Sequence, residues 1–99
     1  MDKTTTTNPI LVEKEDIENF VFPKEEVLDT PESIKERARK IDRATTLGNI
    51  DHVKIKIIFK DSEAVKQVKT TIWASTENNI VLKKGVIIPV YRILDVHLI

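Results

Sequence analysis

The second half of the chain alternates apolar and polar residues, and this alternation limits the fold more than any other feature. Successive side chains of a β-strand point to opposite faces, so a period of two predicts strands with one buried face. Val, Ile and Phe alternate with Lys over residues 53–60, and similar runs follow at 65–74, 79–84, 86–90 and 94–98. Five short strands with tight connections are typical of a meander that curls into a small β-barrel.

A turn at Ser62-Glu63 sets the register of the first two strands. A hairpin there pairs Lys60 with Val65 and Lys56 with Lys69, and it makes one face almost wholly apolar. The apolar face is the predicted core, and the other face carries Lys54, Lys56, Gln67, Lys69, Thr71 and Trp73. Lys56 and Lys69 then lie directly opposite, which is mildly destabilising. Pro89 has no N–H to donate, so the strand at 86–90 should be an edge strand or end there.

One helix is predicted before the strands. Thr30 is suited to an N-cap, Pro31 to the first helical position and Glu32 to the positive end of the helix dipole. Apolar residues then recur at helical spacing, and Gly48 followed by an asparagine is a common helix stop. We predict a helix over residues 31–44. The full organisation is then a flexible acidic arm at 1–29 and a domain of helix plus barrel at 30–99.

The arm is strongly acidic, whereas the rest of the chain is mildly basic. Residues 1–29 hold three lysines against eight acids, and residues 51–99 hold eight basic residues against five acids. The two parts could therefore meet within the molecule. We expect Thr4 to Thr7, a low-complexity run, to be disordered. Two interpretations stay open for Phe20 and Phe22: they fold back on the barrel, or they bind a partner protein as a linear motif.

Composition argues against most catalytic classes. The chain has no cysteine, and its two histidines, His52 and His97, have no second ligand at metal-binding spacing. Two glycines cannot supply a phosphate-binding loop. We therefore predict no enzymatic activity, no cofactor, no metal site and no small-molecule substrate. No apolar run reaches the roughly 20 residues of a membrane helix, and no signal peptide is evident, so we expect a cytoplasmic protein without membrane contact.

A basic face with an aromatic residue is the strongest candidate for a site. Lysines along paired strands suit a phosphate backbone, and a tryptophan suits a stacked base. The predicted nucleic-acid-binding residues are Lys54, Lys56, Lys69, Thr71, Trp73 and Arg92. Arg37, Arg39 and Lys40 of the helix could extend this surface. The alternative is a solvated sheet face kept soluble by lysines, with Trp73 tucked under the helix or the arm.

The segments VKIKIIFKDSEAVKQV, NIVLKKG and IPVYRI, placed after a helix, resemble the Sm-like or SH3-like small-barrel class. Among these they are most similar to the Rof family of inhibitors of the termination factor Rho. TTIWASTENNIVLKKG is also similar to uncharacterised proteins of Bacteroidetes-type bacteria. The chain differs from uridine-binding Sm proteins in having no Asn-Gly pair, and from Rof in its basic barrel.

The resemblance implies a small regulatory module that acts on RNA or on the transcription and RNA-processing machinery. The alternative is a protein–protein adaptor that binds through Phe20 and Phe22 of the arm, with the barrel as scaffold. A homo-oligomer through the open edges of the fourth and fifth strands is also left open.

Overall fold

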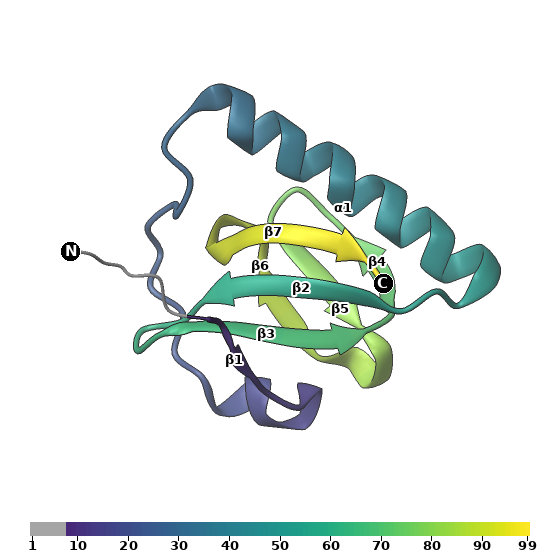
Figure 1. Cartoon of the computed structure of the whole chain (residues 1–99), viewed down its shortest axis with the longest axis horizontal. Coiled ribbons are helices and arrows are strands. Elements are labelled where there is room, and N and C mark those ends of the chain that lie inside the picture. Colours follow the sequence, from purple (N-terminus) through teal and green to yellow (C-terminus); the bar gives the residue numbers. More distant parts are fainter. Residues whose placement is uncertain (1–7) are drawn as a thin grey trace.

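The computed structural model describes residues 8–99, so the threonine run and its expected disorder lie outside the described residues. The fold is mainly β, with one long helix and two sheets (Figure 1). The elements are β1 (Ile10–Leu11), η1 (Lys14–Asn19), α1 (Pro31–Asp51), β2 (Ile55–Lys60), β3 (Val65–Thr70), β4 (Ile72–Ser75), β5 (Asn79–Leu82), η2 (Lys83–Gly85), β6 (Ile87–Pro89), η3 (Val90–Arg92) and β7 (Ile93–Leu98). The prefix η marks short 3₁₀ turns.

The strands form a four-stranded sheet, β1-β3-β2-β7, and a three-stranded sheet, β4-β5-β6. β4 follows β3 after a single residue, so the two sheets are joined by one bent strand. Among the described residues, β6 pairs only with β5 and β7 only with β2. The five-stranded closed barrel is therefore not confirmed. β6, which contains Pro89, is an edge strand as predicted.

The predicted register of the first hairpin is confirmed. Lys60 pairs with Val65, Lys56 with Lys69 and Ile57 with Val68. The alternation places one face of this hairpin in the core, where side chains of both sheets meet. The residues with no exposed surface are Ile55, Ile57, Phe59, Ile72, Ile80, Leu82, Ile88 and Ile93.

The prediction of one strand over residues 65–74 is wrong. Thr70 and Thr71 are both buried, at 4% and 7% exposed, although consecutive residues of a regular strand face opposite sides. The chain bends at this point and passes from the first sheet into the second.

The prediction that the helix ends at residue 44 is also wrong, because α1 continues through Gly48 to Asp51. A Cβ atom at Gly48 would lie 2.5 Å from the backbone oxygen of Ile72. This glycine therefore permits close contact between α1 and β4 rather than terminating the helix. The helix ends where His52 adopts a left-handed conformation with φ 54°, and its N–H donates to the oxygen of Gly48. The predicted start is confirmed, because the Thr30 hydroxyl accepts a hydrogen bond from the Ser33 N–H.

α1 lies along one side of the molecule and packs on β4 and β7 (Figure 1). These two strands are each at the edge of a sheet. The helix therefore covers an edge of both sheets, which is one way in which proteins protect strands that lack a neighbour.

The described part of the arm folds back on the body, as the first of the two interpretations expected. β1 pairs in parallel with β3, and Ile17 of η1 is 1% exposed within the common core. The rings of Phe20 and Phe22 lie 6.3 and 6.0 Å from that of Phe59, centroid to centroid. Residues 8–29 thus contribute to the same hydrophobic core as the strands.

Charged groups also join the arm to the body. The buried guanidinium of Arg37 donates to both carboxylate oxygens of Glu26 at 2.6 Å and to the backbone oxygen of Ile93. The hydrogen bonds that Arg37 donates to Glu26 lower the pKa of this carboxyl group. The acidic arm and the basic body therefore contact each other through this ion pair, as expected.

Candidate functional site

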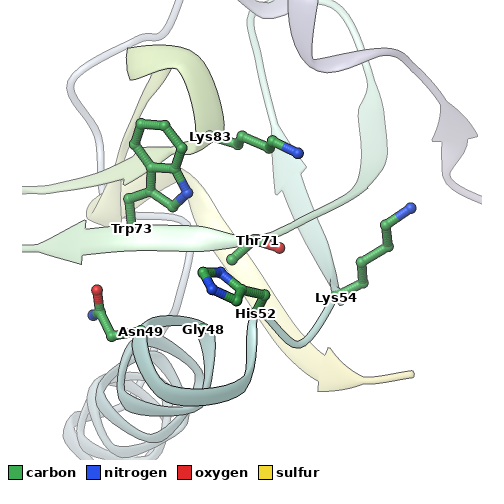
Figure 2. A pocket seen from close by; sticks show the side chains of 7 residues that line it. All are labelled: Gly48, Asn49, His52, Lys54, Thr71, Trp73 and Lys83. Atoms are coloured by element: carbon green, nitrogen blue, oxygen red, sulfur yellow. The ribbon is translucent and has the colours of Figure 1, made fainter.

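An open groove brings together residues from the end of α1 and from the bend between the sheets. It has a volume of about 630 Å³ and is lined by Gly48, Asn49, His52, Lys54, Thr71, Trp73 and Lys83 (Figure 2). Three of these, Lys54, Thr71 and Trp73, belong to the predicted nucleic-acid-binding set. The groove is in the size range of sites that hold one small ligand.

A β-bulge sets the position of Trp73. Ile72 pairs with Leu82 and Ala74 with Val81, so Trp73 is an extra residue on β4. Bulges alter the direction of a side chain and are frequent next to functional sites. Trp73 is 47% exposed, so its ring is not tucked under the helix or the arm.

The groove is electrostatically positive. Lys54 directly precedes β2, and Lys83 belongs to η2. Within residues 8–99, neither lysine forms an ion pair and no carboxylate lines the groove. In Figure 2 Trp73 lies at the left and Lys54 at the right, and between them Lys83 lies above Thr71 and His52.

Thr71 supplies a hydroxyl at the centre of the groove. Thr71 as a whole is 7% exposed, and its side chain makes no hydrogen bond within the described part of the chain. Its backbone oxygen accepts from the N–H of Lys83 at 3.1 Å, which places Lys83 beside the bend. The hydroxyl is therefore available to a ligand.

The other predicted residues lie elsewhere. Lys56 and Lys69 pair across β2 and β3 on the outer face of the first sheet. Arg92 is 5% exposed, and its guanidinium donates to the backbone oxygens of Lys60 at 2.9 Å and Glu25 at 2.7 Å. Arg92 therefore holds the arm and the loop after β2 together and does not reach the groove.

The helix cations that could have extended the surface are engaged in ion pairs. Arg37 binds Glu26, Arg39 lies 2.5 Å from Glu36, and Lys40 lies 2.8 Å from Asp95. Burial raises the pKa of Asp95, but hydrogen bonds from Lys40 and from the N–H of Val96 outweigh it and lower the pKa overall. None of these three cations lines the groove.

Sequence reasoning did not find Asn49, His52 and Lys83 as lining residues. Lys83 becomes a neighbour of Thr71 only through the register of β4 and β5, which the bulge at Trp73 shifts. Asn49 and His52 line the groove because α1 extends past Gly48. A predicted helix longer by seven residues, about two turns, would have placed both at its end.

No protein-family model, curated protein or solved structure matches this chain.

The resemblance to the Sm-like and Rof classes therefore stays a prediction. In the part of the chain that the structure describes, no group of three or more potential metal ligands is present. No described helix is long and apolar enough to cross a membrane.

Proposed function

We propose that this protein is a small non-catalytic binding module that contacts single-stranded RNA through the groove around Trp73. The observation that carries the proposal is the meeting of a half-exposed tryptophan with two lysines that have no ion-pair partner among the described residues. An aromatic ring offers a stacking surface to any base, and lysines attract the phosphate backbone. Lys56 and Lys69 extend the positive charge over the outer face of the first sheet.

Fluorescence anisotropy of a labelled single-stranded RNA tests this proposal. Two lysine–phosphate contacts, from Lys54 and Lys83, give a slope of log affinity against log salt of about −1.4 for a single strand. Affinity should thus fall by roughly sevenfold between about 50 and 200 mM salt. No binding at tens of micromolar protein in low salt would exclude the proposal.

Single substitutions identify the surface. Lys54→Met and Lys83→Met should each reduce the salt slope by about 0.7. Trp73→Ala should weaken binding by about 1–3 kcal/mol through loss of stacking. Lys35→Met is the matched control, because this exposed lysine lies near the start of α1 and does not line the groove. Equal affinity of all four variants and the parent would place the RNA elsewhere on the molecule.

A second candidate is the protein–protein adaptor. Phe20 and Phe22 pack against Phe59 within the chain, whereas Leu11 and Val21 of the arm are 60% and 66% exposed. Deleting the arm is a poor test, because it removes Ile17 from the core. Leu11→Glu and Val21→Glu keep the core and should abolish capture of a partner protein if the arm binds one. Capture that is unchanged in both variants would exclude the adaptor function of the arm.

A further inference from the structure

The charge and the donors in the groove match a phosphomonoester better than an internal phosphate of an RNA strand. Lys54 and Lys83 contribute two ammonium groups, and Thr71 contributes a hydroxyl with no other partner among the described residues. Figure 2 shows the indole nitrogen of Trp73 and the hydroxyl of Thr71 directed toward the side on which both lysines lie. An internal phosphodiester carries one negative charge and two free oxygens, whereas a phosphomonoester carries about −1.5 to −2 charges and three acceptor oxygens.

The groove also has the size of one nucleotide rather than of a continuous strand. Its volume of about 630 Å³ lies within the roughly 300–1,000 Å³ of sites for single small ligands. Trp73 provides one stacking surface, and Asn49 provides an amide whose nitrogen donates to the backbone oxygen of Thr45 at 2.9 Å. That bond orients the Asn49 side chain and leaves its oxygen to accept from a base.

We infer that the groove binds a nucleotide that carries a phosphomonoester, as found at a phosphorylated RNA end. Trp73 stacks on the terminal base, and Lys54, Lys83 and Thr71 bind the phosphate. The inference rests on the proposed function and narrows it from RNA to phosphorylated RNA ends. A free nucleoside monophosphate has the same chemistry, so the experiment must separate the two sources.

Trp73 is the single tryptophan of the chain, so its fluorescence reports on this groove directly. The 99-residue chain is titrated with one short RNA carrying a 5′-phosphate, a 3′-phosphate or only hydroxyl ends, and with adenosine monophosphate. One phosphorylated form should bind about tenfold more tightly than the hydroxyl form, the effect of one additional charge-assisted hydrogen bond. Lys54→Met and Lys83→Met should remove this preference, and Thr71→Val should reduce it about fivefold. Lys35→Met, outside the groove, should leave the ratio unchanged.

The outcomes are distinct for the inference and for the proposed function. Equal affinity for hydroxyl and phosphorylated RNA would overturn the inference and leave RNA binding intact. Binding of no RNA, by fluorescence and by anisotropy, would overturn both. Adenosine monophosphate that binds as tightly as phosphorylated RNA would support the phosphomonoester site and identify a free nucleotide as its ligand. Much weaker binding of the mononucleotide would support the RNA end.

Discussion

Replacing Lys66 by methionine should destabilise the protein by about 3 kcal/mol, because the change leaves a buried carboxylate without its counter-ion. The Lys66 and Asp61 side chains are 8% and 1% exposed and lie 2.5 Å apart. Removal of one partner from a buried ion pair costs about 3–5 kcal/mol. Two backbone N–H groups, of Glu63 and Ala64, still donate to Asp61 at 2.9 Å, so the lower end of this range applies.

Lys66 has a further contact that the same change removes. Its ammonium group lies 3.8 Å from the centroid of the Phe20 ring, a cation–π geometry worth about 0.5–2 kcal/mol. Part of this loss is offset, because methionine keeps apolar contact with the ring. The net expectation of about 3 kcal/mol corresponds to a fall in Tm of roughly 12–24 °C for a domain of this size.

Thermal and urea unfolding followed by circular dichroism measure the effect. The double variant Asp61→Asn/Lys66→Met should lie within about 1.5 kcal/mol of the parent, because it removes both charges. Lys69→Met is the matched control on the same strand, and its exposed side chain should change stability by less than about 0.5 kcal/mol. A loss below about 1 kcal/mol in Lys66→Met, or a double variant as unstable as the single one, would refute the reasoning.

The pH dependence gives an independent check. Burial raises the pKa of Asp61, but hydrogen bonds from Lys66 and from the N–H groups of Ala64 and Glu63 outweigh it and lower the pKa overall. A lowered pKa means that the stabilisation is present above the unfolded value of about 3.9 and is lost as pH falls through the folded value. In Lys66→Met the lowering by Lys66 is lost, and burial is opposed only by the N–H groups of Ala64 and Glu63. The difference in stability between parent and variant should therefore shrink below about pH 4.

Three further predictions concern packing, the arm and the buried arginine. Gly48→Ala should reduce the free energy of unfolding by about 1–3 kcal/mol despite the better helix propensity of alanine, because its Cβ would meet the oxygen of Ile72 at 2.5 Å; urea unfolding measures this, and a stabilised variant would contradict the close contact. Glu26→Gln should flatten the loss of stability on acidification below about pH 4, since the folded state lowers the pKa of Glu26 and its stabilisation is lost as pH falls; unchanged pH profiles would argue against a stabilising contact with Arg37. Arg92→Met should lower the Tm in a melting experiment, because its guanidinium donates to backbone oxygens inside the protein. Its RNA affinity, measured at a temperature at which the variant is folded, should equal that of the parent. A loss of RNA affinity in the folded variant would show that Arg92 belongs to the binding surface.

Local sequence determined the start of the helix and the first hairpin. Thr30 and Pro31 act within one turn of helix, and their caps need no distant contact. The register of β2 and β3 follows from alternation, because a shift by one residue would exchange the buried and exposed faces. The predicted core face and the edge position of Pro89 follow from the same local rules.

Tertiary contacts decided the groove. Gly48 has the same local signature as a helix stop, and only its proximity to Ile72 shows that the helix passes through it. The bulge at Trp73 and the bend at Thr71 arise where one strand serves two sheets, and together they bring Lys83 beside Thr71. The sequence predicts Arg92 to be a surface cation, yet it is buried and donates hydrogen bonds to backbone oxygens that are distant in the chain. Periodicity reports which face of an element is buried, but it carries no information on which distant residue occupies the space beside it.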